Sequence, residues 1–578
     1  MAKEKWVVTT KKADFNAMAE RFGISPMLAR IIRNRDVVSE EEIDYYLNGT
    51  PERMHNPRQM KDMEKGAQLL LSSIAEHKKI RVIGDYDVDG VCSSYILKKG
   101  LSRLGADVSV QIPHRVMDGY GLNLRLIEEA CADGVDTIVT CDNGIAAREE
   151  IAYAKSNGMT VVVTDHHEVP CEGIDENRRE LLPEADAIIN PKQETCHYPY
   201  KEICGALVAY KLVQVMFGLA GVDDGETLRE LMEFAAIATV CDVMELLDEN
   251  RIVVKYGLRY LNDSRNVGLR KLIEVCGLSD RKISSYHIGF VIGPCLNATG
   301  RLDSAMQALE LFESTSEEET TAIAVALKDM NDSRKAMTER GVEAAVSQVE
   351  ESYAADRIIV VYLPECHESI AGIIAGRLKE KYYKPVYVLT DGETGIKGSG
   401  RSIEAYSMYD GLCEVKDLLD KFGGHKMAAG VSMQLDKLEE FRERLNENAH
   451  LTEDDLTPKL KIDIPMPLVY ASREFIWELE RLEPFGNGNR KPAFAQKNLK
   501  VRNCSVRGKN RNVAGFTLED ASGYSVSGVY FGEADTFVQE VKDHGGYVDV
   551  IYYPELNEFG GSSSLQMVVT HYKFLNEK

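Results

Sequence analysis

Short apolar runs alternate with amphipathic segments between residues 80 and 190. The runs have the length of buried strands, and the segments between them, such as 122–132 and 146–157, have helical composition. Strands are expected at 80–83, 108–112, 137–140, 160–163 and 187–189. Strand and helix in alternation predict a parallel sheet with right-handed crossovers. Ligands of such a sheet bind beyond the carboxyl ends of its strands.

Other patterns divide the rest of the chain. Apolar residues at helical spacing, with a capping-box sequence at Ser39 and Glu42, indicate a helical start. The last part contains short strands with Gly-rich turns, which favour a small barrel or a sandwich. The expected parts are a helical N-terminal extension at 1–60, a parallel α/β domain at 61–303, connecting helices at 304–350, a smaller α/β domain at 351–455 and a β domain at 456–578.

Length and composition indicate a multidomain globular protein. The 578 residues are too many for one hydrophobic core. No run approaches the ~20 apolar residues that cross a bilayer, and the first residues lack the apolar core of a signal peptide, so we expect a cytoplasmic protein without membrane contact. The twelve cysteines include no CxxC pair and are expected to be reduced. Cys196-His197 with Cys204 lacks the second pair of ligands that zinc requires.

The net charge of −23 argues mildly against a surface that is basic throughout, as nucleic-acid binding would favour. A local basic groove is compatible with it. Metal ions would also neutralise some of the acids.

Three aspartates follow the first strand at alternate positions. Asp85, Asp87 and Asp89 come directly after the run 80–83, and alternate residues of an extended chain point to one side. Converging carboxylates repel one another unless a cation lies between them. Hard oxygen ligands suit Mg²⁺ or Mn²⁺, and the alternative is a solvated acidic loop.

Further candidate ligands follow other apolar runs. Asp142-Asn143-Gly144 and Asp165-His166-His167 come after two of the expected strands, and Asp242 follows the apolar segment 234–240. Each alone is more typical of a helix cap or a structural histidine. Together they offer enough oxygen and imidazole ligands for two cations at one edge of one sheet. Two divalent ions stabilise in-line displacement at phosphorus, so we expect hydrolysis of a phosphoester or a phosphoanhydride.

Two glycine-rich stretches lie in the smaller α/β domain. Gly398-Ser399-Gly400-Arg401 and the segment 422–430, which contains His425 and Lys426, combine glycines with positive side chains. Such loops can present backbone N–H groups to a phosphate, although an ordinary turn is equally compatible with each.

These motifs resemble those of the DHH phosphoesterases. Asp-x-Asp-x-Asp-Gly, Asp-Asn-Gly, Asp-His-His and a distant Asp are similar to the four motifs of that family, and Gly423-Gly424-His425 is similar to the signature of the associated DHHA1 domain. More narrowly, the chain resembles the bacterial single-strand-specific DNA exonucleases of this family. The supporting stretches are 112–115, 119–121, 189–192, 204–206, 293–294, 297–302, 399–401 and 482–489.

The resemblance implies an architecture and an activity. The architecture is an α/β protein with a parallel-sheet DHH domain, a smaller α/β DHHA1 domain joined to it by a long helix, and an OB-like C-terminal β-barrel. The implied activity is 5′-to-3′ degradation of single-stranded DNA to 5′ mononucleotides with two Mn²⁺ or Mg²⁺ ions, in DNA repair and recombination. Single-stranded DNA, a single-strand-binding protein and a recombination helicase are the implied partners of a monomer.

The resemblance also implies residue roles. The implied metal ligands are Asp85, Asp87, Asp89, Asp142, His166 and Asp242. Asp85 and Asp87 would favour one ion and Asp89 the other, with Asp142 between them. The implied catalytic residues are Asp142, His167 beside the scissile phosphate, and Asp165, which would orient a ligand histidine. The implied DNA-holding residues are Arg115, Tyr120, Arg301, His367, Ser399, Arg401, Gly424 and His425.

Two positions depart from the family pattern. Cys295 stands where the family usually carries Arg, and Cys366-His367-Glu368-Ser369 stands where it carries Trp-His-Glu-Gly. These changes bear on DNA affinity, processivity and substrate length. Two alternative functions stay open at this point. One is a DHH phosphodiesterase of short oligonucleotides, cyclic dinucleotides or polyphosphate, and the other is a non-catalytic scaffold of a replication complex.

Overall fold

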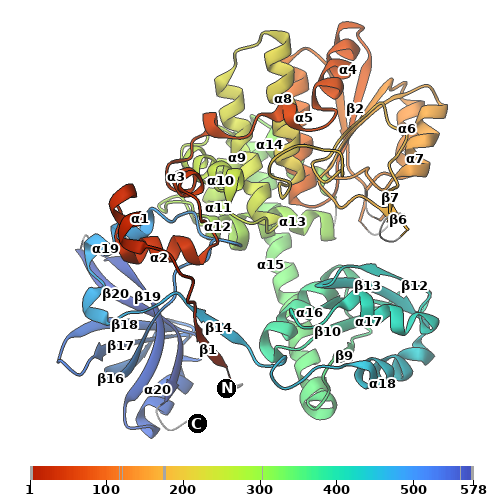
Figure 1. Ribbon diagram of the computed structural model, residues 1–578. Coiled ribbons are helices and arrows are strands. Elements are labelled where there is room, and N and C mark those ends of the chain that lie inside the picture. Colours follow the sequence, from red (N-terminus) through yellow and green to blue (C-terminus); the bar gives the residue numbers. More distant parts are fainter. Residues whose placement is uncertain are drawn as a thin grey trace. The chain divides into compact units, whose positions relative to one another are not determined.

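The chain forms two compact units, each built from segments that are far apart in sequence (Figure 1). The computed structural model describes residues 4–115, 118–119, 121–173, 178–302, 304–392, 394–559 and 562–574. The first unit contains Met1–Lys5, Asn56–Asp242 and Arg259–Pro458, and the second contains Trp6–His55, Val243–Leu258 and Lys459–Lys578. Tyr120, an expected DNA-holding residue, lies outside the described residues. Among the helices that are described, none has the length and apolar character needed to span a bilayer.

The first unit contains the expected parallel sheet. Its strand order is β3-β2-β4-β5-β8, and every neighbouring pair is parallel. The strands are β2 (Lys79–Ile83), β3 (Asp107–Gln111), β4 (Thr137–Cys141), β5 (Thr160–Thr164) and β8 (Ala187–Ile189). In the central strands Val82 lies opposite Val139, and Val139 opposite Val162. All three are fully buried, because helices cover both faces.

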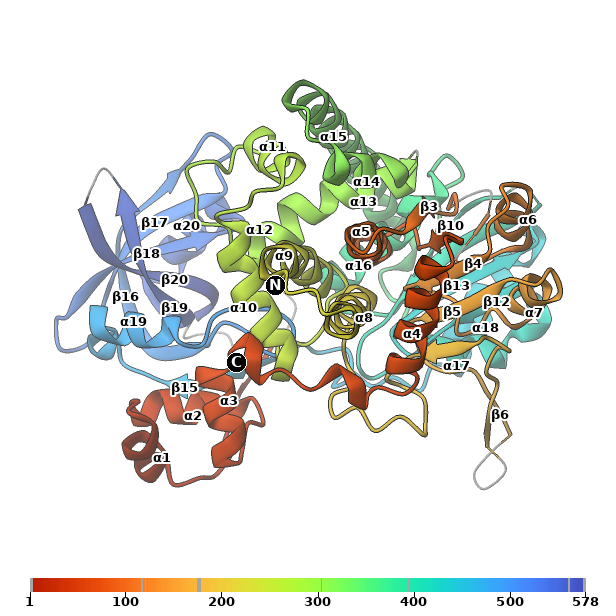
Figure 2. The ribbon, with the colours of Figure 1, turned by 90° about the horizontal axis from the view of Figure 1, so that it is seen from above.

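Helices cover the two faces of this sheet (Figure 2). One face carries α4 (Met63–Ala75), α5 (Val88–Arg103) and α8 (Gly205–Ala220), and the other carries α6 (Leu124–Ala132) and α7 (Arg148–Ser156). The core under α6 and α7 is made of aliphatic side chains from these helices and from β2, β4 and β5. The strand–helix alternation predicted from the sequence is therefore confirmed.

The part of the first unit that follows this sheet, up to residue 348, is helical. Its elements are α9 (Gly225–Cys241), α11 (Val267–Val275), α12 (Ser285–His287), the π-helical turn Ile288–Ile292, α13 (Gly293–Leu302) and α14 (Met306–Glu313). Asp242 was expected at the edge of the sheet, after the apolar segment 234–240. That segment belongs to α9. That expectation was wrong because a helix buried on all sides shows an apolar run without periodicity, as a buried strand does. The connecting helices at 304–350 are mainly one helix, α15 (Glu317–Gln348).

The smaller α/β domain has a mixed sheet of order β12-β13-β11-β10-β9. Its elements are β9 (Ile359–Tyr362), α16 (Glu368–Tyr382), β10 (Val386–Asp391), β11 (Ile396–Arg401), α17 (Met408–Glu414), β12 (Lys421–Gly424), β13 (Ala428–Met433) and α18 (Leu438–Asn448). Within this sheet β9 and β10 are parallel neighbours, and the other neighbouring pairs are antiparallel. The stretch 398–401 is part of β11, and 422–430 forms the hairpin of β12 and β13.

The second unit is built around a closed barrel. The strand order is β15-β16-β17-β18-β20-β19, and an additional pairing of β16 with β19 closes the ring, which decides for a barrel. Its elements are β15 (Ile464–Pro465), α19 (Arg473–Glu480), β16 (Phe494–Arg507), β17 (Val513–Glu519), β18 (Ser525–Phe531), α20 (Ala534–Asp543), β19 (Tyr547–Phe559) and β20 (Ser562–Phe574). The strands β1 (Lys5–Val8) and β14 (Lys459–Ile462) form a separate two-stranded sheet.

The N-terminal helices share the hydrophobic core of this barrel. They are α1 (Phe15–Phe22), α2 (Pro26–Asn34) and α3 (Glu40–Asn48), the last with the predicted Ser39–Glu42 capping box. The guanidinium of Arg251, in α10 (Asp248–Leu261), donates to the carbonyls of Tyr46, Arg481 and Leu482 at 2.7–2.9 Å. It also lies over the Tyr46 ring, 4.0 Å from the centroid. One buried side chain thus joins three separate segments of the second unit.

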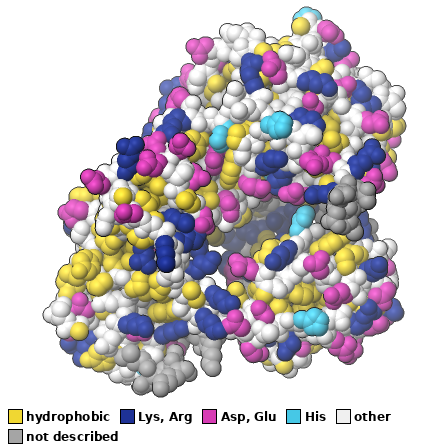
Figure 3. Space-filling view, in the orientation of Figure 1, with side chains coloured by type: hydrophobic (Ala, Val, Ile, Leu, Met, Phe, Trp, Pro, Cys, Tyr) yellow, Lys and Arg dark blue, Asp and Glu magenta, His cyan; other side chains and the backbone are white. Residues whose placement is uncertain are grey.

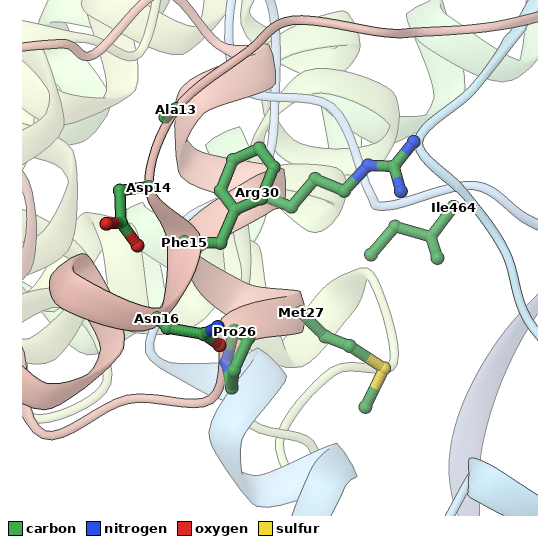
Figure 4. A pocket seen from close by; sticks show the side chains of 8 residues that line it. All are labelled: Ala13, Asp14, Phe15, Asn16, Pro26, Met27, Arg30 and Ile464. Atoms are coloured by element: carbon green, nitrogen blue, oxygen red, sulfur yellow. The ribbon is translucent and has the colours of Figure 1, made fainter.

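The surface of the second unit mixes apolar and basic side chains. Figure 3 shows hydrophobic and Lys or Arg side chains gathered over the barrel region on the face that is seen. A pocket between α1, α2 and β15 is shown in Figure 4. Its lining residues are Ala13, Asp14, Phe15, Asn16, Pro26, Met27, Arg30 and Ile464.

Candidate metal centre

The three aspartates that follow β2 lie in a strand-to-helix turn. Asp87 is the N-cap of α5, where its Oδ1 accepts from the Gly90 N–H at 3.0 Å, and Asp89 lies in the first turn of that helix. The alternate spacing suggested an extended chain across the three aspartates, but the chain turns into a helix there. The turn is tight, because a Cβ on Gly90 would collide with the backbone carbonyl of Asp85. Asp85 and Asp89 are 1% and 2% exposed.

The Asp89 carboxylate faces the N-terminus of α8. Its Oδ2 accepts from the Gly205 N–H at 2.6 Å and its Oδ1 from the Ala206 N–H at 2.7 Å. Such N–H groups have no partner within their own helix, and the helix dipole favours a negative charge there. The role of Gly205 and Ala206 did not follow from the sequence, because a backbone donor leaves no side-chain signal.

Asp142 and His166 meet across two neighbouring strands. Asp142 follows β4 with φ of 60°, and His166 follows β5. The Nε2 of His166 lies 3.0 Å from Oδ1 of Asp142 and 3.5 Å from Oδ2 of Asp89. Gly205 packs against Asp142, since a Cβ on Gly205 would lie 2.8 Å from the Asp142 Cβ. The strand ends thus converge as parallel-sheet topology requires.

Asp165 contacts both histidines. Its Oδ1 accepts from the His166 N–H at 2.7 Å and from the His167 N–H at 3.1 Å, and it lies 2.8 Å from Nδ1 of His167. Its Oδ2 accepts from the Ile145 N–H at 2.9 Å. Asp165 thus holds the backbone of the expected ligand histidine, His166, and the ring of His167, which was expected beside the scissile phosphate. The His167 side chain is 43% exposed and that of His166 only 7%.

Asp242 is the C-cap of α9 and completes the site from outside the sheet. Its Oδ2 lies 3.8 Å from Nε2 of His166. Within the described residues, three groups of side chains bring one possible ligand atom each to within 4.8 Å of one another. The groups are Asp85 with Asp87 and Asp142, Asp89 with His166 and Asp242, and Asp142 with His166 and His167. The six expected ligands are therefore close together.

The electrostatics of the cluster fit a bound cation. Burial and the neighbouring Asp87 raise the pKa of Asp85 to about 8, and burial with Asp89 and Asp87 does the same for Asp242. Burial and then Asp89 also raise the pKa of Asp87 and Asp142. Carboxylates placed this close without an ion oppose one another's ionisation. Oxygen and imidazole ligands of this kind suit Mg²⁺ or Mn²⁺.

The histidines behave differently from each other. Burial lowers the pKa of His166, which favours the neutral form that ligates metals. For His167 burial opposes the charge, but the hydrogen bond to Asp165 is decisive and raises the pKa to about 9. His166 is therefore suited to a cation and His167 to an anionic group.

Several expected DNA-holding residues gather around an arginine group. Burial and then the charges of Arg115, Arg334 and Arg401 lower the pKa of Arg301 to about 10. Arg301 donates from Nη1 to the Ser369 carbonyl at 2.5 Å, and Arg115 lies over the Tyr86 ring at 4.7 Å. Mutual repulsion among these partly buried arginines indicates a site for an anion such as a phosphate.

The other expected DNA-holding residues lie in the smaller α/β domain. His367 caps α16, with its Nδ1 2.7 Å from the Ser369 hydroxyl. Ser399 and Arg401 lie on β11, and the Arg401 guanidinium packs on Gly372 of α16. Gly424 ends β12 with φ of 145°, and His425 is exposed in the hairpin that follows. Gly424 pairs with Ala429 of β13, which pairs with Gly400 of β11, so Gly424 lies two strands across the sheet from the Arg401 end of β11.

Three domain families match the chain. Residues 79–239 match the DHH family, N-terminal domain, residues 355–450 the DHHA1 domain and residues 462–571 the RecJ OB domain. The single-stranded-DNA-specific exonuclease RecJ of Bacillus subtilis (strain 168) is 32% identical over 573 residues, which cover 98% of this chain and 70% of the relative. The chain belongs to the RecJ family.

Other RecJ proteins agree with this assignment. The single-stranded-DNA-specific exonuclease RecJ of Escherichia coli (strain K12) is 31% identical over 94% of this chain and 95% of its own length. The crystal structure of RecJ from Thermus thermophilus in complex with Mn²⁺ superposes with a TM-score of 0.82 and 26% identity, covering 99% of this chain and 80% of that one. The expected fold class and the resemblance to DHH phosphoesterases are confirmed.

Proposed function

We propose that this protein is a single-strand-specific 5′-to-3′ DNA exonuclease that hydrolyses phosphodiester bonds with two divalent ions and releases 5′ mononucleotides. The observation that carries the proposal is the pair of ligand groups joined by the 3.0 Å contact between Asp142 and His166. Relatives named as single-stranded-DNA-specific exonucleases support the strand specificity and the exonuclease activity. The proposal includes the role in DNA repair and recombination that the resemblance implied.

Two ligand groups would hold the ions. Asp85 and Asp87 belong to one and Asp89 to the other, as the sequence analysis expected, and Asp142 would lie between them. His166 and Asp242 complete the group of Asp89. Either Mn²⁺ or Mg²⁺ suits these ligands. When bound, a pair of such ions stabilises the charge that develops in in-line displacement at phosphorus.

The chain's own residues orient the substrate and the His167 ring. Asp165 fixes the ring of His167, which stays half exposed and can therefore meet a phosphate oxygen. Arg115, Arg301 and Arg401 supply positive charge. His367 and Ser399, in the smaller α/β domain, would contact the 5′ end of the strand. Gly424 and His425 provide a further contact from the β12–β13 hairpin.

The barrel supports a nucleic-acid strand as the substrate. In the second unit Lys500 lies over the Tyr547 ring at 5.4 Å, and Lys573 over the Trp6 ring at 4.9 Å. Phe531 is 58% exposed on β18. Exposed aromatic rings next to cations allow bases to stack while phosphates are neutralised. A hydrolase of short oligonucleotides or cyclic dinucleotides has no need of such a surface.

Single strands labelled at the 5′ or the 3′ end test the proposal. With Mn²⁺ or Mg²⁺, the protein should release labelled mononucleotide first from the 5′-labelled strand and leave duplex DNA intact. Release only from the 3′ end would overturn the polarity. Faster turnover of a dinucleotide than of a long strand would favour the short-substrate hydrolase. If an Asp142→Ala, His166→Ala double variant matched the wild type in both metal binding and hydrolysis, a non-catalytic scaffold would be favoured.

The division of the ligands can be measured directly. Asp85→Asn and Asp87→Asn should weaken one of two metal-binding steps in a calorimetric titration, Asp89→Asn the other, and Asp142→Asn both. Equal loss of both ions in every variant would contradict this division. The proposal further includes a cytoplasmic monomer that works with a single-strand-binding protein and a recombination helicase. Sedimentation and pull-down with those proteins test the last points.

A further inference from the structure

Two cysteines from separate helices face each other in the first unit. Cys276 is the C-cap of α11, and Cys295 lies in the first turn of α13. Their Sγ atoms are 3.8 Å apart, and both are free thiols. Cys295 is 2% exposed, whereas Cys276 is partly exposed. A reagent in solution can therefore reach the first sulfur, and the second lies directly behind it.

Helix α15 supplies the surroundings of the pair. The Asn331 side-chain N–H lies 3.5 Å from Sγ of Cys295. Lys328 and Lys335 flank the sulfurs on the same helix, and Asp332 pairs with both lysines at 2.5 and 3.7 Å. The hydrogen bond with Cys295 is the main cause that lowers the pKa of Cys276, against burial and Asp332, and the two lysines add to it. The same hydrogen bond and burial raise the pKa of Cys295. The positive charges of Lys328 and Lys335 thus favour a thiolate at Cys276, the partly exposed sulfur of the pair.

We propose that Cys276 and Cys295 are a redox-sensitive pair that a hydroperoxide-class oxidant converts to a reversible disulfide. The Cys276 thiolate attacks one oxygen of the O–O bond and becomes a sulfenic acid, and the other oxygen leaves after protonation, as water from hydrogen peroxide or as an alcohol from an organic hydroperoxide. The Cys295 sulfur then attacks the Cys276 sulfur, an S–S bond forms, and the sulfenic oxygen leaves as water with the Cys295 proton. The two thiols lose two electrons and the O–O bond gains them. A dithiol reductant reverses the change.

The linkage would act on the metal centre through α13. The sulfurs must approach from 3.8 Å to about 2.05 Å, which ties the start of α13 to the end of α11. The other end of α13 carries Gly300, where a Cβ would collide with the Tyr86 carbonyl oxygen, and Arg301, which donates to the Ser369 carbonyl. Tyr86 lies between the proposed ligands Asp85 and Asp87. A restrained α13 therefore restrains the turn that carries Asp85 and Asp87. It also restrains Arg301, which contacts the smaller α/β domain at Ser369.

Thiol mapping of the whole protein tests the disulfide without using the proposed nuclease activity. The protein is treated with hydrogen peroxide in the presence of a chelator, catalase removes the peroxide, and all remaining thiols are alkylated in denaturant before mass spectrometry. The expected result is a linked peptide pair that contains Cys276 and Cys295, with a loss of two alkylated thiols out of twelve, restored by dithiothreitol. Oxidation of Cys276 to a sulfinic acid without linkage, or linkage to another cysteine, would overturn the proposal.

Matched variants separate the pair from the other cysteines. Cys276→Ser and Cys295→Ala should each abolish the linked peptides, and Cys131→Ser, which changes a partly buried cysteine of α6, should leave them unchanged. After metal is added, oxidised wild type should cleave single strands at least several-fold more slowly than reduced wild type. Peroxide treatment should leave the cleavage rate of Cys276→Ser unchanged. Linkage with an unchanged rate would overturn the effect through α13. Absence of activity in the reduced protein would count against the proposed function alone, because the mapping does not depend on it.

Discussion

Asp242→Asn tests whether the acidic cluster is held together against its own repulsion. Burial, Asp89 and Asp87 together raise the pKa of Asp242 to about 8. A carboxyl group with a raised folded pKa makes the protein less stable as pH rises from the unfolded value, near 4, toward the folded one. At pH 7 the cost covers the roughly 3 pH units above the unfolded pKa, which correspond to about 4 kcal/mol of lost stability. Roughly 2 kcal/mol remains after allowance for a side chain that is 29% exposed and shares protons with its neighbours.

In a chelator at pH 7 the variant should therefore be more stable than wild type by about 2 kcal/mol, a few degrees in the unfolding temperature of the first unit. The difference should vanish near pH 4, where both side chains are neutral. Added Mn²⁺ should stabilise wild type more than the variant, because the variant has lost a ligand. Thermal unfolding with and without Mn²⁺ between pH 4 and 8 measures both effects. A variant that is less stable than wild type in chelator at pH 8 would refute this account of the cluster.

Three substitutions test how the fold positions the site. Gly205→Ala should lower hydrolysis at least tenfold without unfolding the protein, because its Cβ would meet the Asp142 Cβ at 2.8 Å. Arg251→Ala should destabilise the second unit by about 3–5 kcal/mol in denaturant unfolding, because it leaves two buried carbonyls and a partly buried one without their charged donor. Asp224→Ala should cost about 1 kcal/mol, because Asp224 is the N-cap of α9 and accepts from the Thr227 N–H at 2.9 Å.

The substitutions at Gly205 and Asp224 have matched controls. Gly218→Ala lies on the same helix as Gly205, and its Cβ would have open space, so activity should be kept. Asp224→Asn should retain most of the cap. The hydrogen bonds from Thr227 and Arg103 lower the pKa of Asp224 to about 2, so the contribution of its charge is present above pH 4 and lost as the pH falls toward 2. Equal loss of activity in both glycine variants, or equal loss of stability in both Asp224 variants, would contradict the proposed contacts.

The sequence pattern was sufficient for the parallel sheet and for the candidate ligands that follow its strands. Apolar runs report burial on both faces, and parallel strands end at one edge, so Asp85, Asp142 and His166 could be placed together before any coordinates. Asp242 could be placed there only by the family motif, since the segment before it is a buried helix. A continuous apolar run does not distinguish a buried helix from a buried strand.

Contacts between distant segments were decided only by the tertiary structure. The two backbone donors on Asp89 and the 3.8 Å approach of Cys276 to Cys295 join residues whose sequence shows no sign of their partners. The grouping of 243–258 with the N-terminal helices and the barrel is of the same kind. Periodicity reports which side of an element is buried. The partner that buries it, and the backbone groups that it meets there, depend on the whole folded chain.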